Sequence, residues 1–250
     1  MHRILFAWGP FVLFSYGLSL VVGFLAATWL ARREALRHPF EVEVTADRIV
    51  DLTCLLMLGG ILGGRLFFVL MHWPVYQRHP WEILAIWHGG LIWYGGLAGG
   101  LAAGWGYAKR FKLSLIRGAD QVAPYLALAH AIGRIGCFLN GCCYGLPSSG
   151  WLGMHFPGVE GRVLPTQLFE SVGLFLLCMV LLALRRPLRR PAGRLFGCYL
   201  ASYAVLRFAL EFLRQQPMIW SGLTLQQLIS LAMFVAGLVF LLRRSGEAAS

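Results

Sequence analysis

The sequence predicts an all-α, polytopic membrane protein with seven transmembrane helices. The chain has 250 residues, of which 58% are hydrophobic and only 13% charged, whereas soluble globular proteins carry roughly 25% charged residues. Seven apolar stretches approach the ~20 residues that a helix needs to cross a bilayer: 11–30, 49–71, 89–108, 119–139, 166–184, 194–213 and 222–242. They lack the alternation of a transmembrane strand, which favours a helical bundle over a barrel. We expect one transmembrane domain over residues 1–250.

The distribution of basic residues predicts the orientation of these helices. If the seven stretches cross in turn, 15 of the 22 Lys and Arg residues lie on one side, in segments 32–48, 109–117, 185–194 and 243–244. Cytoplasmic loops carry such an excess, so we expect the N-terminus outside and the C-terminus inside. The net charge of +11 therefore indicates topology and contact with membrane lipid rather than a nucleic-acid partner. The first stretch is expected to be a retained helix, because basic residues follow it and no clear small-residue cleavage site ends it.

The connections between the stretches have distinct compositions. Residues 31–48 include Pro39, which argues against a continuous helix there. Residues 72–88 are rich in Trp and His and suit the membrane interface. Residues 140–165 form the longest outer loop, and a Pro-Ser-Ser-Gly turn interrupts it. The second and third stretches carry glycines at four-residue spacing, which favours close helix packing: Gly59, Gly63, Gly95, Gly96, Gly99 and others.

Polar side chains inside the stretches gather toward their outer ends. An arginine keeps its charge, and one inside a transmembrane helix costs at least ~2.5–3.5 kcal/mol unless it has a partner or water. The predicted orientation places two arginines and several other polar residues in one leaflet, which indicates a cavity open to that leaflet. A transporter is expected to bind nearer the midplane. The residues concerned are Tyr94, His130, Arg134, Asn140, Glu170, Tyr203, Arg207 and Glu211.

The spacing around Arg207 suggests a site for a phosphate group. Tyr203, Arg207 and Glu211 follow one another at four-residue intervals and share a helix face. Arg207 can pair with Glu211 and still offer N–H donors, and the guanidinium fork suits phosphate geometry. The alternative is that Arg134 and Arg207 only join helices through acidic partners, for which Glu211, Glu170 and Asp120 are the candidates.

Three of the six cysteines, Cys137, Cys142 and Cys143, lie close together at the outer end of the fourth stretch. A disulfide from Cys137 to either of the others suits an oxidising compartment, and a nucleophilic thiol is a further option. The spacing lacks the paired pattern of a zinc site and offers no clear fourth ligand, so we expect no metal there. The other cysteines lie in apolar stretches and are expected to be small core residues.

Residues 133–145, GRIGCFLNGCCYG, resemble the signature of the prolipoprotein diacylglyceryl transferases of bacterial inner membranes. That signature looks like Gly-Arg-x-Gly-Asn-Phe-x-Asn-Gly-Glu-x-x-Gly, and here Cys137 replaces the Asn and Cys142 replaces the Glu. Further matches follow in family order: Tyr16-Gly17, the Gly-Gly-Leu runs at 89–91 and 95–97, Pro165-x-Gln167-Leu168-x-Glu170, and Tyr203-x-x-x-Arg207-x-x-x-Glu211-x-x-Arg214.

The resemblance implies a transferase of the bacterial inner membrane whose active site faces the outer leaflet. Such an enzyme moves the diacylglyceryl group of phosphatidylglycerol onto the lipobox cysteine of a prolipoprotein signal peptide. A thioether forms and glycerol phosphate leaves, with no metal or organic cofactor. The resemblance implies catalytic roles for Arg134, Arg207, Tyr94 and His130. It implies substrate-binding roles for Tyr16, Gly95, Gly96, Asn140, Gly145, Glu170, Tyr203 and Glu211.

One departure from the family concerns the base. The family usually reads His-Gly-Gly-Leu where this chain reads Tyr94-Gly95-Gly96-Leu97, and a phenol with the ordinary pKa of about 10 is a poor base at neutral pH. We expect Tyr94 to orient the substrate, and the alternatives for removing the proton are an imidazole from His130 or His88 and the ionisation of the substrate thiol itself. The departure leaves open a second function, a non-catalytic paralogue that binds phospholipid or lipoprotein. The sequence assigns no oligomeric state.

Overall fold

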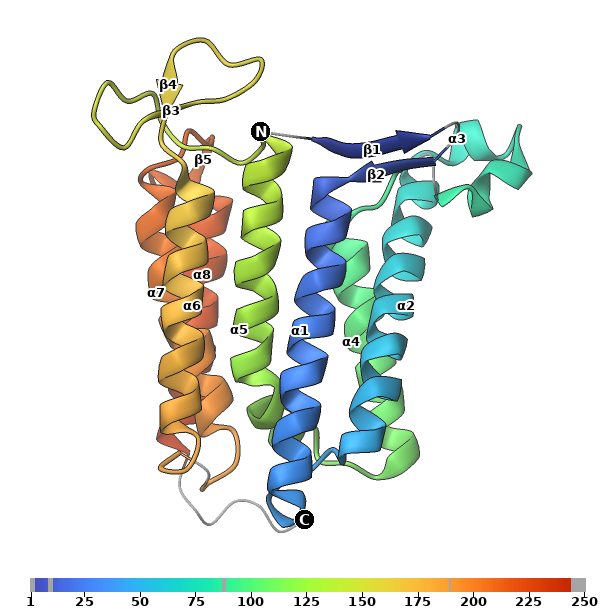
Figure 1. Ribbon diagram of the computed structural model, residues 1–250, viewed down its shortest axis with the longest axis vertical. Coiled ribbons are helices and arrows are strands. Elements are labelled where there is room, and N and C mark those ends of the chain that lie inside the picture. Colours follow the sequence, from blue (N-terminus) through green and yellow to red (C-terminus); the bar gives the residue numbers. More distant parts are fainter. Residues whose placement is uncertain (1–2, 9–10, 87–88, 189, 244–250) are drawn as a thin grey trace. The chain divides into compact units, whose positions relative to one another are not determined.

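The computed structural model describes residues 3–8, 11–86, 89–188 and 190–243. Its contacts divide the chain into two compact units. The first unit comprises residues 1–31 and 119–250, and the second comprises residues 32–118. Both consist mainly of long helices (Figure 1). Most of the predicted site residues belong to the first unit, and Tyr94, Gly95 and Gly96 belong to the second.

The core of the first unit lies between α5, α6 and α7. On α5, the buried residues Ala123, Ala127 and Ala131 follow at four-residue intervals, and their small side chains allow neighbouring helices to approach closely. Leu174 and Leu181 of α6 fill the space opposite and are fully buried. The helices of this unit are α1 (Ser15–Arg37), α5 (Leu115–Asn140), α6 (Thr166–Leu184), α7 (Arg194–Glu211) and α8 (Leu225–Leu242). The end of α1, from residue 32, and the start of α5, up to residue 118, belong to the second unit.

The second unit is built on one tightly packed helix pair, α2 (Ala46–Met71) and α4 (Trp93–Phe111). A Cβ added to Gly63 would lie 2.8 Å from the Cα of Gly99, closer than real Cβ atoms approach. The glycine ridges therefore bring the two backbones into contact, and the predicted close packing is confirmed. The short helices α3 (Trp73–Tyr76), η1 (Pro39–Glu41) and η2 (Pro80–Leu84) complete this unit.

Three antiparallel hairpins add a small amount of strand to the predicted helices. They pair β1 (Ile4–Trp8) with β2 (Phe11–Phe14), β3 (Met154–His155) with β4 (Arg162–Val163), and β5 (Met218–Trp220) with β6 (Leu223–Thr224). The expected helix from residue 11 is thus wrong over its first four residues. They are aromatic, β-branched or Leu, a composition that suits a strand, and Phe14 pairs with Ile4.

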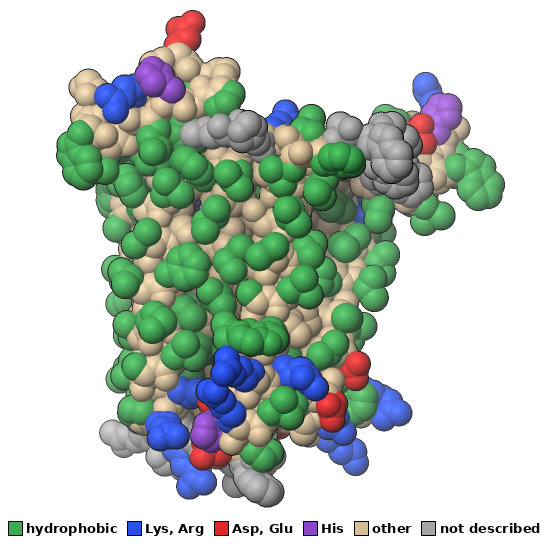
Figure 2. Space-filling model, in the orientation of Figure 1, with side chains coloured by type: hydrophobic (Ala, Val, Ile, Leu, Met, Phe, Trp, Pro, Cys, Tyr) green, Lys and Arg blue, Asp and Glu red, His purple; other side chains and the backbone are tan. Residues whose placement is uncertain are grey.

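Each of the other predicted stretches contains an observed helix, but two of them begin too early. Residues 89–92 precede α4, and residues 223–224 form strand β6 before α8. By length and composition, α1, α2, α5, α6 and α8 are able to cross a membrane. The helices α4 and α7, with 19 and 18 residues, occupy the other two predicted stretches. Large hydrophobic side chains cover the outward sides of the helices, while Lys and Arg gather near helix ends (Figure 2). A soluble protein does not expose apolar surface on this scale, so the chain is an all-α, multi-pass membrane protein.

Candidate active site

Glu170 is the centre of a buried polar cluster in the first unit. It lies in the second turn of α6 with 2% of its surface exposed. Its Oε1 atom lies 2.9 Å from Nη2 of Arg134 on α5 and accepts a hydrogen bond of 3.1 Å from the hydroxyl of Tyr203 on α7. His130, one turn before Arg134, places Nε2 3.8 Å from the same oxygen and packs edge-on against the Tyr203 ring. The structure thus joins four of the predicted site residues.

Arg134 retains hydrogen-bonding capacity after pairing with Glu170. Its side chain is 17% exposed, so it is largely withdrawn from solvent. Among the described residues, its Nε atom is buried and has no hydrogen-bond partner. Native proteins satisfy nearly all buried polar groups, and an unsatisfied donor calls for an explanation such as a ligand or water. Arg134 is therefore paired with Glu170 and still has a donor, Nε, that is able to bind a ligand or water.

Arg207 and Glu211 form a second buried pair, on α7. Nη1 of Arg207 lies 2.7 Å from Oε2 of Glu211 and forms an ion pair with it. The other carboxylate oxygen accepts a 2.9 Å bond from the Thr224 hydroxyl. Thr224 also caps α8 in a reciprocal capping box with Gln227. Glu211 is therefore held by Thr224 on one oxygen and pairs with Arg207 through the other.

The buried arginines Arg134 and Arg207 both lie close enough to His130 and Tyr203 to interact with them electrostatically. Asp120, the third acidic candidate for pairing with an arginine, is occupied elsewhere, since its oxygens accept bonds from the backbone N–H groups of Gly193 and Phe196 at the start of α7. The structure therefore brings two guanidinium groups toward one region with one carboxylate beside each.

The loop after α5 is fixed by α6. Thr166 donates to the carbonyl of Cys143 at 3.0 Å, and Gln167 donates to the carbonyl of Cys142 at 2.6 Å. Gly145 is buried, and a Cβ there would meet the side chains of Thr166 and Leu164. The sequence prediction did not assign Thr166 or Gln167 to the site, although Gln167 was part of the motif that ends at Glu170. The predicted site residue Asn140 ends α5, half-buried, beside this loop.

Tyr16 approaches the same loop from α1. It lies in the first turn of α1. A Cβ at Gly136 of α5 would lie 3.4 Å from the Cα of Tyr16 and 2.7 Å from the Cβ of Ser19, one turn later. The Tyr16 side chain is an electrostatic neighbour of Arg134 and of three cysteines in the motif. Tyr16 therefore lies close to Arg134 and the motif cysteines, and its role in substrate binding stays a prediction.

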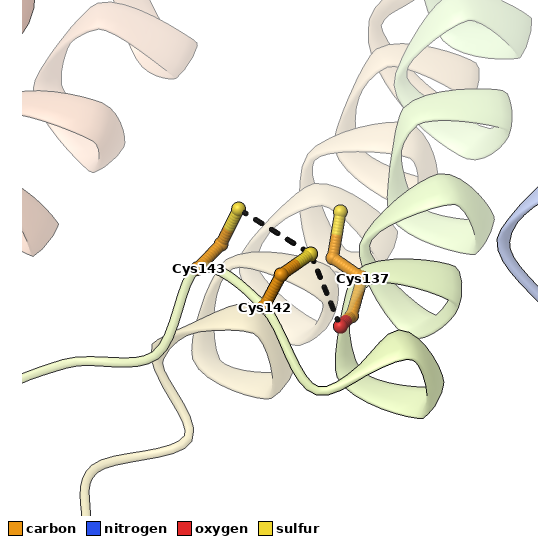
Figure 3. Close-up of side chains that lie close together, drawn as sticks. All are labelled: Cys137, Cys142 and Cys143. Atoms are coloured by element: carbon orange, nitrogen blue, oxygen red, sulfur yellow. Dashed lines mark hydrogen bonds between the residues drawn. The ribbon is translucent and has the colours of Figure 1, made fainter. Parts of the chain in front are cut away.

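The three motif cysteines form a compact group. Cys137 extends from the last turns of α5, and Cys142 and Cys143 extend from the loop that follows (Figure 3). Their sulfur atoms all lie within 4.8 Å of one another. All six cysteines are free thiols, so the structure contains no disulfide among the described residues.

In the second unit, Tyr94 lies in the first turn of α4 with half of its side chain exposed. Gly95 is buried against Gly63 and Phe67 of α2, so helix packing explains the glycine. Gly96 lies near the carbonyl of Gly60. The roles of these residues in substrate binding stay predictions. His88, the other histidine considered, lies outside the described residues.

Arg65 is a buried arginine that the sequence prediction left without a role. It is 6% exposed and donates to the backbone carbonyls of Glu82, Ile83, Gly89 and Gly90. Its guanidinium also lies over the rings of Phe68 and Tyr76. Arg65, which lies on α2, thus holds the segment that connects α2 to α4 against α2.

Comparison with known proteins identifies the family. A family model described as "Prolipoprotein diacylglyceryl transferase" matches residues 3–243. A Bacillus cereus protein named phosphatidylglycerol--prolipoprotein diacylglyceryl transferase is 35% identical over 261 residues, which is 99% of this chain and 94% of that protein. Proteins of the same name from Streptococcus uberis (34%, 94% of this chain and 92% of the relative) and Geobacter sulfurreducens (36%, 89% and 87%) are similar. The chain belongs to the prolipoprotein diacylglyceryl transferase family.

Proposed function

We propose that this protein transfers the diacylglyceryl group of phosphatidylglycerol to the lipobox cysteine of a prolipoprotein signal peptide. The names of its relatives state the lipid and the protein substrate for those proteins. The observation that carries the proposal is that Arg134 and Arg207 are both largely buried and each pairs with one carboxylate, while Nε of Arg134 has no hydrogen-bond partner among the described residues.

The chemistry requires a group that holds a departing phosphate ester. The substrate sulfur attacks a glycerol carbon of the lipid, a C–S bond forms, and the C–O bond to phosphate breaks with its electron pair on the leaving glycerol phosphate. Negative charge grows on the phosphate oxygens during this step. Preorganised donors aimed at such charge commonly contribute a factor of about 10²–10³ to the rate, and Arg134 and Arg207 supply them.

The other site residues orient these two arginines and the substrates. Glu170 and Glu211 anchor the guanidinium groups, and Tyr203 fixes Glu170 from α7. His130 offers an imidazole one helical turn before Arg134, beside Glu170 and Tyr203. We assign Tyr94 an orienting role, through a hydrogen bond from its hydroxyl to substrate. Tyr16, Asn140 and Gly145 are assigned to the walls of the binding site.

The proposal includes a location. Seven helices cross the bacterial inner membrane with the N-terminus outside and the C-terminus inside, and the active site faces the outer leaflet. The asymmetry of basic residues supports this orientation. Phosphatidylglycerol then enters from the membrane, and the signal helix of the substrate docks along the bundle. The non-catalytic alternative is not favoured, because the relatives are named as transferases.

A reconstituted assay tests the proposal. The purified protein, in vesicles that contain phosphatidylglycerol, is given a synthetic prolipoprotein signal peptide, and the lipid-modified peptide is measured by mass spectrometry. We expect a peptide heavier by one diacylglyceryl group, and no product from a peptide whose lipobox cysteine is replaced by serine. Absence of product from the wild-type protein, with a family member from Bacillus cereus active in the same assay, would refute the proposed function.

A further inference from the structure

The motif cysteines have the geometry of a metal-binding triangle. The sulfur atoms of Cys142 and Cys143 are 3.7 Å apart, and the Cys137 sulfur lies within 4.8 Å of both. A tetrahedral zinc site with Zn–S bonds of about 2.3 Å places its sulfurs roughly 3.8 Å apart. The observed triangle is therefore of the right size for one ion, and it requires only a small closure around it.

The backbone of the loop holds this triangle in shape. Gly141 and Cys143 both have positive φ values, 74° and 65°, and these turn the chain back toward the end of α5. The N–H of Cys142 donates to the carbonyl of Cys137. The carbonyls of Cys142 and Cys143 are in turn held by Gln167 and Thr166. A non-glycine residue such as Cys143 is uncommon at positive φ, so the turn is a specific feature of this loop.

Positive charge surrounds the three sulfurs. Arg134 is an electrostatic neighbour of Cys137 and Cys143, and Arg214 is a neighbour of Cys143. Three thiolates and one divalent cation carry a net negative charge, which these guanidinium groups offset. Thiolate ligands also select zinc and other soft cations over magnesium or calcium. The environment therefore suits a zinc–thiolate site.

We propose that Cys137, Cys142 and Cys143 bind one zinc ion, and that the thiol of the substrate cysteine takes the fourth position. The inference rests on the proposed function for the identity of that fourth ligand. Catalytic zinc sites have three protein ligands and an open position. The sequence predicts no metal here because only three ligands are visible in it, and a substrate ligand supplies the fourth.

Zinc binding would deprotonate the substrate thiol, a task for which this chain lacks the usual family histidine because Tyr94 replaces it. A thiol that coordinates zinc is deprotonated outright, so no strong protein base is needed. The proton of the substrate thiol passes to water. The sulfur then forms its bond to the glycerol carbon, the C–O bond to phosphate breaks, and the phosphate leaves with the electron pair beside Arg134. The zinc ion is neither oxidised nor reduced.

Cobalt substitution tests metal binding without reference to activity. The full-length protein in detergent is treated with chelator and reductant and then titrated with Co²⁺, whose thiolate complexes absorb through sulfur-to-metal charge transfer. We expect one Co²⁺ per chain, displaced by Zn²⁺. Cys142→Ser should weaken Co²⁺ binding at least tenfold, while Cys54→Ser and Cys198→Ser, outside the triangle, should leave it unchanged. Failure to bind Co²⁺, or a disulfide between any two of the three cysteines in protein purified without reductant, would overturn the proposal.

The fourth position is tested with the substrate peptide. A signal peptide with the lipobox cysteine should change the visible spectrum of the Co²⁺ protein, and the same peptide with serine should not. Identical spectra with both peptides would overturn the assignment of the fourth ligand.

Activity separates this inference from the proposed function. A free thiol is only a few per cent ionised at pH 7, so removal of zinc should slow transfer by at most about 30-fold, and the defect should shrink toward pH 9. Full transfer by the zinc-free protein would refute the role of zinc in activating the substrate thiol and leave the proposed function intact. Absence of transfer by zinc-loaded protein would refute the function, and the cobalt titration would still decide whether the site exists.

Discussion

The protein contains two kinds of buried arginine site, one in each compact unit. In the second unit, Arg65 makes four hydrogen bonds to backbone carbonyls, and the described residues include no carboxylate paired with it. In the first unit, Arg134 and Arg207 each pair with a buried carboxylate, and Nε of Arg134 has no hydrogen-bond partner among the described residues. Arg65 therefore donates to backbone carbonyls, whereas Arg134 and Arg207 pair with carboxylate side chains and Arg134 keeps one donor without a partner.

We propose that this difference separates a structural role, for Arg65, from a ligand-binding role, for Arg134 and Arg207. A guanidinium group has five donors in a fixed fork. Where backbone carbonyls take most of them, the side chain fixes a loop. Where carboxylates orient the group and leave donors directed elsewhere, a second anion can bind. The comparison predicts that substitutions of Arg65 lower stability, whereas substitutions of Arg134 or Arg207 lower activity.

The largest expected effect is on transfer by Arg134→Ala and Arg207→Ala. Each should reduce the rate by at least about 10²–10³, the usual loss when one donor to a developing anion is removed. Lysine at either position should rescue poorly, because a point charge cannot replace the fork. Transfer is measured per folded molecule, after the amount of monodisperse protein has been matched by gel filtration. Near-normal rates for either alanine variant would remove that arginine from the phosphate site.

A paired substitution controls for misfolding of the Arg134 variant. Removing one partner of a buried ion pair costs about 3–5 kcal/mol because the other charge stays buried alone. Arg134→Gln combined with Glu170→Gln removes both charges and should restore stability relative to Arg134→Gln alone. The double variant should stay inactive. Recovery of transfer in the double variant would mean that Arg134 acts only by neutralising Glu170.

Arg65→Met is expected to act on stability alone. It removes four hydrogen bonds, and each buried carbonyl left without a partner costs about 1–3 kcal/mol, while the methionine retains much of the apolar packing. The midpoint of thermal unfolding in detergent should fall, and transfer per folded molecule should stay within about threefold of wild type. A catalytic loss as large as that of Arg207→Ala at unchanged thermal stability would break the comparison.

Tyr94→Phe tests the residue that departs from the family. If the hydroxyl orients substrate, its loss should cost about 0.5–3 kcal/mol, which slows transfer by roughly 2- to 150-fold. Tyr94→His should be tolerated, since it restores the usual family residue. A pH–rate profile for wild type and Tyr94→Phe provides the check. A profile that loses its rise at high pH in the phenylalanine variant would identify the phenol as the base.

The smallest effect is expected from Thr224→Ala, which removes both the α8 cap and the hydrogen bond to Glu211. Loss of such a cap costs about 1 kcal/mol. Transfer should fall only a few-fold, since Arg207 still pairs with Glu211. Thr224→Ser keeps the hydroxyl and is the matched control. A loss of transfer equal to that of Arg207→Ala would show that Glu211 orientation, not the donor of Arg207, limits the reaction.

The sequence predicted the helices well because membrane spans need long apolar stretches, and Thr166–Leu184 and Arg194–Glu211 lie where expected. It also predicted the Arg207–Glu211 pair, since both residues lie on one helix face. It missed the strand at Phe11–Phe14, because an apolar stretch next to a helix carries no signal of its partner strand. It also placed the three motif cysteines close together, but their geometry could not be predicted because it depends on backbone turns at Gly141 and Cys143.

The contacts of Thr166, Gln167 and Arg65 could not be predicted, because their partners are backbone carbonyls. Every residue has a carbonyl, so the sequence does not indicate which one is held. Thr224 and Gln227 are different, since a Thr-x-x-Gln pattern before an apolar run is a recognisable helix start. Their role at Glu211 still depends on the turn between α7 and α8.

The most direct test of the phosphate site is equilibrium binding of glycerol phosphate to the purified protein, measured by calorimetry for three arginine-to-lysine variants. Glycerol phosphate carries the anion without the acyl chains, so apolar contacts do not contribute. Arg134→Lys and Arg207→Lys should each raise Kd by about tenfold or more, equivalent to about 1.4 kcal/mol, and Arg65→Lys should leave it within about threefold of wild type. Equal Kd values for wild type, Arg134→Lys and Arg207→Lys would contradict the assignment of the phosphate site to these two arginines.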